Sequence, residues 1–229
     1  MPATKWIEAD AYIFDIDGTL LNAYGGAHYN AFHAALKKHF DLDCKIDGVP
    51  LHGNTDVGII RAVLAREGLM AGEFDARRQA MLTDMCDEVE RNRQQIRAEL
   101  CPGIPQLLAQ LASKKKLLGI ATGNLERIGW LKMETAGIKD HFRFGAFSDR
   151  HETREDIFRD AAQQARNLGG DAISLCFVGD TPHDVTAART LGIPCVAVTT
   201  GNYTTAQLDE HSPDMCIGCF DEILPYLPA

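Results

Sequence analysis

The feature that most constrains this chain is a short apolar run that leads directly into two carboxylates and a glycine, YIFDIDGTL at residues 12–20. Its bulky β-forming residues predict a strand that is covered on both faces, as in the middle of a parallel sheet. Asp15 and Asp17 are two residues apart, so their side chains leave an extended chain on the same side. Two like charges at the end of a buried strand are costly unless a cation lies there, and Mg²⁺ takes oxygen ligands of this kind. Gly18 then lets the backbone turn sharply and approach an anion.

Helix and strand patterns alternate after residue 100, which predicts βα units and a parallel sheet. Ligands of such sheets bind at the carboxyl ends of the strands, where polar residues interrupt these apolar runs. We therefore expect residues 122–124 and 180–184 to meet Asp15 and Asp17 at one edge of the sheet. After the strand at residues 12–14, the predicted strands are 117–121, 142–147, 173–178 and 194–198, with a small edge strand near 215–217.

The segment between residues 23 and 100 has a different pattern. Phe32, Leu36 and Phe40 recur at helical spacing, and a long charged helix follows later in the segment. We expect no strand in residues 28–100. The predicted organisation is an α/β core with a Rossmann-like parallel sheet, residues 1–22 and 101–229, and an inserted all-helical cap, residues 23–100.

Composition narrows the possible partners and the compartment. The net charge of −9 argues against a nucleic-acid or membrane-surface partner, because no basic run offsets it. Seven cysteines are spread singly along the chain, which fits a reducing compartment. The first residues hold no apolar signal core, and no run approaches transmembrane length. We expect a cytoplasmic monomer or homodimer.

The first motif has a family resemblance. Residues 15–20, DIDGTL, resemble the first signature of the haloacid dehalogenase superfamily of phosphatases. The resemblance implies that Asp15 is the nucleophile and that Asp17 is the general acid and base, held protonated for its first proton transfer. It also implies that Gly18 and Thr19 lie at the substrate.

Two later motifs resemble further signatures of that family. Residues 120–124, IATGN, are similar to the second signature, which implies that Thr122, Gly123 and Asn124 bind a phosphoryl oxygen, helped by a helix N-terminus near Leu125. Residues 177–184, FVGDTPHD, resemble the fourth signature. That likeness implies a Mg²⁺ site whose residues are Asp15, Asp17 (through its backbone carbonyl), Asp180 and Asp184.

The third signature departs from the family pattern. The family usually places a lysine before the helix that precedes the fourth signature, but residues 148–156, SDRHETRED, contain neither lysine nor proline. An arginine can supply the missing cation with a bidentate contact. We choose Arg154, with Arg150 second, and predict that the Arg154 side chain contacts an active-site aspartate.

The cap contributes one candidate loop, residues 53–56. Asn54 and Thr55 are either substrate-binding residues that reach over the site or the N-cap of the following helix, and the sequence leaves both interpretations open.

The resemblance implies a Mg²⁺-dependent phosphomonoester hydrolase that acts on a small phosphorylated metabolite through an aspartyl-phosphate. Phosphoglycolate-like compounds are the nearest family analogy. Asp17 favours phosphate chemistry, because the dehalogenase branch lacks this second aspartate. The alternatives are a phosphonate hydrolase or phosphomutase of the same fold, for which the insert offers Lys37, Lys38 and Lys45 as Schiff-base candidates, and a non-catalytic regulator that binds Mg²⁺ or phosphate.

Overall fold

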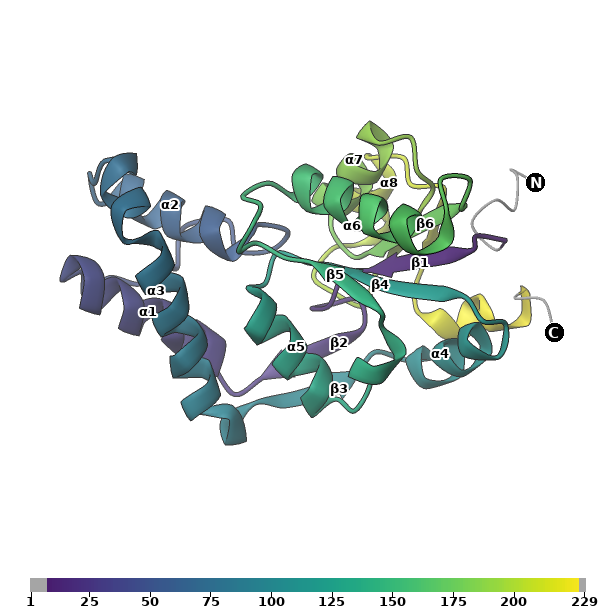
Figure 1. Cartoon of the computed structure of the whole chain (residues 1–229), viewed down its shortest axis with the longest axis horizontal. Coiled ribbons are helices and arrows are strands. Elements are labelled where there is room, and N and C mark those ends of the chain that lie inside the picture. Colours follow the sequence, from purple (N-terminus) through teal and green to yellow (C-terminus); the bar gives the residue numbers. More distant parts are fainter. Residues whose placement is uncertain (1–7, 227–229) are drawn as a thin grey trace.

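The computed structural model describes residues 8–226, and their centre is a six-stranded parallel sheet with helices on both faces (Figure 1). The predicted α/β fold is confirmed. Expectations for residues 1–7 and 227–229 lie outside the described part of the chain. The strands, in their order across the sheet, are β5 (Phe144–Ala146), β4 (Leu117–Ala121), β1 (Ala11–Phe14), β6 (Leu175–Gly179), β7 (Cys195–Val198) and β8 (Met215–Ile217).

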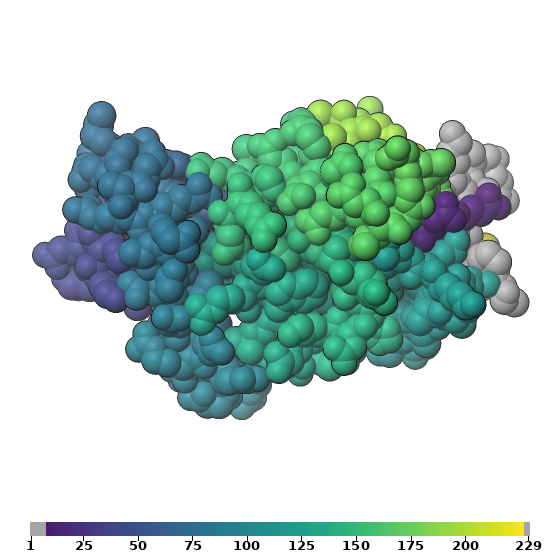
Figure 2. Space-filling view, in the orientation of Figure 1, coloured from purple at the N-terminus to yellow at the C-terminus, as the bar shows by residue number. Residues whose placement is uncertain are grey.

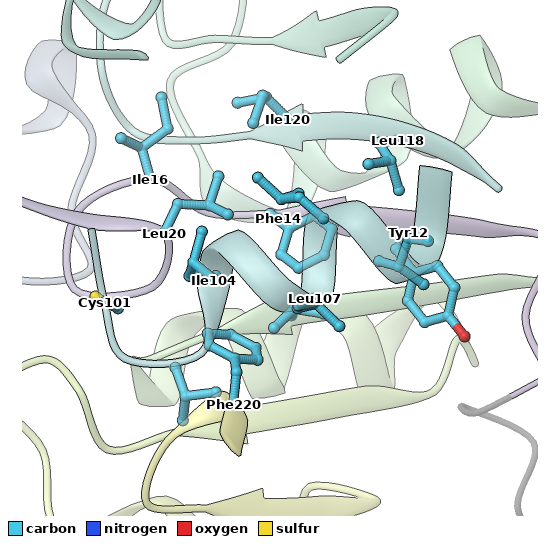
Figure 3. Close-up of a cluster of buried hydrophobic side chains, with 14 of the residues drawn as sticks. Tyr12, Phe14, Ile16, Leu20, Cys101, Ile104, Leu107, Leu118, Ile120 and Phe220 are labelled. Carbon is cyan, nitrogen blue, oxygen red and sulfur yellow. The ribbon is translucent and has the colours of Figure 1, made fainter. Parts of the chain in front are cut away.

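Strand β1 lies between β4 and β6, and all four of its residues are buried. Its side chains alternate between two hydrophobic clusters. Tyr12 and Phe14 pack with Leu107 and Phe220 on one face, as Figure 3 shows. The other two residues of β1 pack on the opposite face with Phe158, among others. This double burial explains why the strand is apolar throughout until Asp15.

The helices of the sheet region fall on its two faces (Figure 1). Within residues 8–226, no helix is both long enough and apolar enough to cross a membrane. One face carries α4 (Ile104–Ser113) and α5 (Glu126–Thr135), and the other carries α6 (Arg154–Gly169), α7 (Pro182–Thr190) and α8 (Thr205–Asp209). Short 3₁₀ helices occupy Arg93–Gln95, Lys139–His141, Phe220–Glu222 and Leu224–Tyr226.

The inserted segment forms a helical lobe at one end of the molecule, coloured blue and purple in Figure 2. Its helices are α1 (Ala27–Phe40), α2 (Asp56–Arg66) and α3 (Ala71–Arg91). Their buried face also receives Leu125, Ile128 and Leu131, so the lobe packs against α5 of the sheet region. This packing brings the insert to the carboxyl ends of the strands. The proposed domain boundary at residues 23–100 stays a prediction.

Two strands connect the lobe to the sheet region. β2 (Leu21–Tyr24) and β3 (Arg97–Leu100) pair antiparallel, with Leu21 opposite Leu100. The expectation of no strand in residues 28–100 is therefore wrong at β3. Its sequence, RAEL, has no run of β-forming residues, and its extended form comes from pairing with β2.

Candidate active site

The predicted site residues converge at the carboxyl ends of three neighbouring strands. Asp15 and Asp17 follow β1, Thr122 follows β4, and Asp180 follows β6. All four line one cavity of about 330 Å³ between the sheet and the helical lobe. The expectation that these distant parts of the sequence meet at one edge of the sheet is confirmed.

Three carboxylates in this region fit a divalent cation. Asp15, Asp180 and Asp184 are buried, and each offers one oxygen within 4.8 Å of the others. The Oδ1 atom of Asp15 is buried without a hydrogen-bond partner. Burial raises the pKa of Asp15 to about 6, with Asp184 also raising it while Arg154 acts to lower it. Burial, followed by the charges of Asp15 and Asp184, raises the pKa of Asp180 well above its ordinary value. A bound cation would relieve this repulsion, so the residues present suit Mg²⁺.

The backbone beside Asp180 is kept free of side chains. Gly18 has a φ of +81°, and a Cβ built on it would lie 2.4 Å from Oδ2 of Asp180. A Cβ on Gly201 would lie 1.8 Å from the same atom. Glycine at both positions therefore leaves room for the carboxylate, and at Gly18 it also permits the left-handed turn.

Arg154 supplies the cation that the altered third signature left open. Its Nη2 donates to Oδ2 of Asp15 at 2.7 Å, and its Nε donates to Oδ1 of Asp184 at 2.6 Å. Burial lowers the pKa of Arg154, but the two carboxylates raise it above the ordinary value, so the guanidinium stays charged. The predicted contact with an active-site aspartate is confirmed. Arg150 is exposed and lies 3.9 Å from Glu126.

Asp17 is held by a pair of donors that bind the same oxygen. Lys132 Nζ lies 2.7 Å and Asn124 Nδ2 lies 2.8 Å from its Oδ2. Burial acts to raise the pKa of Asp17, but Lys132 and Asn124 lower it below the ordinary value. These partners stabilise the carboxylate of Asp17 in the protein without substrate. The expectation that Asp17 is held protonated for the first proton transfer stays a prediction.

A model of the haloacid dehalogenase-like hydrolase family matches residues 12–198. The chain belongs to this family. The resemblance predicted from its signatures is thereby confirmed, and the protein is an enzyme of the hydrolase class.

Curated relatives of this hydrolase include several named phosphatases. A phosphoglycolate phosphatase of Yersinia pestis is 28% identical over 219 residues, which cover 93% of this chain and 90% of that protein. A probable phosphatase of Dickeya dadantii, IndB, is 27% identical over 220 residues, which cover 93% of this chain and 90% of that protein.

Solved structures share the fold of this hydrolase. CbbY from Rhodobacter sphaeroides, in complex with phosphate, matches with a TM-score of 0.72 and 20% identity over 94% of this chain and 96% of that one. A hydrolase from Pseudomonas syringae matches with a TM-score of 0.67 and 20% identity over 95% of this chain and 97% of that one. At these identities the likeness concerns the fold.

The N-terminus of α5 is occupied by carboxylates of this hydrolase itself. Asp56 Oδ2 accepts the N–H of Leu125 at 2.8 Å, and Asp149 Oδ2 accepts the N–H of Glu126 at 2.5 Å. Two of the N–H donors at this helix end therefore already have anionic partners, and the expectation that the helix end helps to bind phosphate stays a prediction. Gly123 still lines the cavity.

The loop at residues 53–56 caps a helix and also lies at the cavity. Thr55 is the N-cap of α2, since its Oγ1 accepts the N–H of Gly58 at 2.9 Å. The same hydroxyl donates to the carbonyl of Glu152 in the sheet region at 2.8 Å. Asn54 lines the cavity, and its carbonyl oxygen would lie 2.3 Å from a Cβ built on Gly123. A substrate-binding role for Asn54 and Thr55 stays a prediction.

The remaining predicted residues have protein partners. Thr19 is fully buried, and its Oγ1 donates to Oδ1 of Asp180 at 3.0 Å, so it orients one of the three clustered carboxylates. Asp184 Oδ2 accepts the N–H and the hydroxyl of Thr181, which closes a capping box at the start of α7. Asn124 donates to Thr122 Oγ1 at 2.8 Å as well as to Asp17. Substrate binding by Thr19 and Asn124 stays a prediction.

Sequence reasoning missed Lys132, a cation of the site that is only 5% exposed. Its Nζ also donates to Oδ1 of Asn124 at 2.7 Å. A signal was present, because Lys132 follows Ile128 by four residues and therefore falls on the buried stripe of α5. A buried lysine needs an anionic partner, and the aspartates predicted at the strand ends were the candidates for it.

His28 was also missed, and Asp56 was named only as a member of the candidate loop at residues 53–56. The Nε2 atom of His28 lies 3.0 Å from Oδ2 of Asp56, and both residues line the cavity. Neither belongs to a signature of the family, and only the fold of the inserted segment brings them to the sheet region.

Proposed function

We propose that this protein is a Mg²⁺-dependent phosphomonoester hydrolase that acts on a small phosphorylated metabolite through an aspartyl-phosphate intermediate. The observation that carries the proposal is the state of Asp15, which has one oxygen held by Arg154 and the other buried without a partner beside two further carboxylates. Such a carboxylate is fixed in place and has an oxygen available for attack. The relatives named phosphatases support phosphate as the group that is transferred.

The metal site proposed for Mg²⁺ consists of Asp15, Asp180 and Asp184, with the backbone carbonyl of Asp17 as a further oxygen. A bound ion neutralises part of the phosphate charge. Arg154 adds a second positive charge beside Asp15 and, through Asp184, ties the nucleophile to the start of α7. These charges let a dianionic phosphate approach a carboxylate that would otherwise repel it.

Asp15 attacks phosphorus, and the bond to the leaving oxygen breaks as the aspartyl-phosphate forms. The leaving oxygen needs a proton, for which Asp17 is the donor. Asp17 is a carboxylate before substrate binds, so it takes up a proton from water when the phosphate binds, because the negative charge of the phosphate raises the pKa of a neighbouring carboxyl group. Once the proton has been given, Lys132 and Asn124 again favour the carboxylate, the form that activates the hydrolytic water.

Thr122 and the amides of Gly18 and Gly123 are proposed to hold the phosphoryl oxygens. These groups follow two neighbouring strands and line the same cavity as Asp15. Donors that are fixed before the reaction stabilise the charge that develops in the transition state without reorganising.

The insert lysines do not favour the phosphonate hydrolase. Lys37 and Lys38 are exposed and pair with Asp41 and Asp84 at 2.7 Å. Lys45 is exposed as well, and none of the three lines the cavity. A Schiff-base lysine has to be unprotonated, and an ion pair stabilises its charged form. We therefore keep the phosphomonoesterase as the single proposed function.

The direct test is phosphate release from an aryl phosphate by the purified protein, with and without Mg²⁺. We expect release that requires Mg²⁺ and stops in excess chelator, and we expect Asp180→Asn to raise the Mg²⁺ concentration needed. Undiminished turnover in chelator would overturn the metal assignment. No release under any metal condition would favour the non-catalytic regulator.

A further inference from the structure

The cavity continues beyond the carboxylates to a wall supplied by the inserted segment. Part of this wall is apolar, and most of its apolar side chains are fixed by burial in the helical lobe. A leaving group attached to a phosphate at Asp15 would lie against it. The apolar side chains that line the cavity are Phe32, Ile46, Leu51 and Ile59.

The positive side chains around the same cavity already have carboxylate partners. Within residues 8–226, every lysine and arginine that lines this cavity is in an ion pair, and one of its two histidines is as well. The pairs are Lys132 with Asp17 at 2.7 Å, Arg154 with Asp15 at 2.7 Å and with Asp184 at 2.6 Å, and His28 with Asp56 at 3.0 Å.

The other polar groups of the wall are neutral amides, one further histidine and Tyr29, whose hydroxyl donates to Asp47 at 2.9 Å. His52 Nδ1 lies 3.0 Å from Nδ2 of Asn202, so its ring bonds to an amide across the cavity. Asn22 and Asn54 also line the space. Amides can hydrogen-bond to hydroxyl groups, but they do not offset the cost of removing a carboxylate from water.

We propose that this enzyme acts on phosphomonoesters whose leaving group is uncharged and has an apolar side, and that it discriminates against leaving groups with a carboxylate of their own. The inference rests on the phosphomonoesterase function proposed above. It separates this chain from the substrate named for several of its relatives, because phosphoglycolate carries a carboxylate on its leaving group. The apolar wall and the absence of an unpaired lysine or arginine among its described residues carry the argument.

The first test compares two esters of similar size, 2-hydroxyethyl phosphate and phosphoglycolate. The first has a neutral hydroxymethyl group where the second has a carboxylate. With Mg²⁺ present, we expect kcat/KM for the neutral ester to be higher by about ten-fold or more, the size of effect given by an uncompensated charge. Equal or higher kcat/KM for phosphoglycolate would overturn the inference while leaving the phosphatase function in place. Release from neither ester, nor from an aryl phosphate, would overturn the proposed function and the inference with it.

The apolar wall is tested with an alkyl phosphate series from ethyl to hexyl. Each methylene that the wall buries is expected to raise kcat/KM by up to about four-fold. A flat series would contradict burial of the leaving group at this wall.

A matched pair of variants then tests whether the absence of an unpaired positive charge in the cavity causes the preference for the neutral ester. Leu51 lines the cavity and is half-buried, so both Leu51→Arg and Leu51→Gln can be accommodated. We expect the arginine to reduce the preference for the neutral ester by about five-fold or more, and the glutamine to leave the ratio within about two-fold. The same ratio in both variants would contradict an electrostatic origin of the preference.

Discussion

Arg154 Nη2 lies 2.7 Å from Oδ2 of Asp15, and this ion pair is buried at the end of the central strand. Arg154 is the first residue of α6, where a positive charge is disfavoured by the helix dipole. The helix tolerates it because Asp15 and Asp184 compensate the charge and because Thr153, Glu155 and Asp156 supply the cap and the acidic first turn. The pair therefore links Asp15, the proposed nucleophile, to helix α6.

Removing this guanidinium should strongly reduce activity. Arg154→Ala leaves two buried carboxylates without their partner, so we expect kcat/KM to fall by about 10³-fold and the free energy of unfolding to fall by about 3–5 kcal/mol. Arg154→Lys keeps a charge but loses the fork of two donors, and should give an intermediate loss. Arg150→Ala is the matched control and should keep kcat/KM within about two-fold, because Arg150 is exposed. A larger loss for Arg150→Ala than for Arg154→Ala would move the role to Arg150.

Lys132 should matter for turnover rather than for substrate affinity. Lys132→Met removes one of the two donors that fix Oδ2 of Asp17, and we expect kcat to fall by about 10- to 100-fold with KM changed far less. Lys139→Met is the control, because Lys139 is half-exposed and lies 3.8 Å from Glu134. Steady-state kinetics of the two variants provide the measurement, and an unchanged kcat in Lys132→Met would contradict a role at Asp17.

Stabilisation by Mg²⁺ should increase with pH. Burial and the neighbouring Asp184 raise the pKa of Asp15 in the metal-free fold from 3.8 to about 6. Between these two values the folded protein binds more protons than the unfolded chain, so the stability of the metal-free protein falls as the pH rises. The cation competes with these protons, and the rise in Tm on adding Mg²⁺ should be larger at about pH 7.5 than at about pH 5.

Thermal unfolding with and without Mg²⁺ at the two pH values measures this linkage. Asp15→Asn removes one of the two carboxyl groups with a raised pKa and should reduce the difference between the two pH values. A Tm increase that is equal at both pH values in the unaltered protein, or larger at the lower one, would contradict a carboxylate metal site.

Asp56 should stabilise the junction between the helical lobe and the sheet region. It accepts the N–H of Leu125 and pairs with His28, and its own N–H donates to the carbonyl of Gly123 at 2.8 Å. Asp56→Ala leaves a buried N–H at the start of α5 unsatisfied, so we expect the free energy of unfolding to fall by about 1–3 kcal/mol. Asp75→Ala, at an exposed ion pair with Arg61, should change it by less than about 1 kcal/mol. Urea unfolding of both variants measures whether Asp56→Ala lowers the free energy of unfolding more than Asp75→Ala does.

The local sequence pattern was sufficient to predict those parts of the fold whose conformation and burial follow from a single segment of the chain. The apolar run before Asp15 had to be a covered strand, and the strand ends of an open parallel sheet had to meet. The position of Arg154 followed from the same logic, because a cation at a helix start needed a carboxylate partner. Strand β3 could not be predicted in this way, since its extended form depends on β2 more than seventy residues earlier in the chain.

Tertiary contacts decided the details of the site that the sequence did not reveal. The sequence gives no sign that N–H groups at the start of α5 have protein partners. In the structure, Asp56 and Asp149 accept two of these N–H groups from other parts of the chain. The ionisation of Asp17 likewise depends on Lys132, 115 residues away, which a signature at residues 15–20 cannot show. Such contacts join side chains that are far apart in the sequence, and no helical or strand periodicity predicts them.

The most direct test of the proposed mechanism is to locate the phosphoryl group during turnover. The protein is mixed with an aryl phosphate and Mg²⁺, quenched in acid within the first turnovers, digested, and analysed by mass spectrometry. We expect a phosphorylated peptide that contains Asp15. We expect no such peptide from Asp15→Asn, whose kcat should fall below detection. A phosphorylated peptide elsewhere in the chain, or near-normal turnover by Asp15→Asn, would contradict Asp15 as the nucleophile.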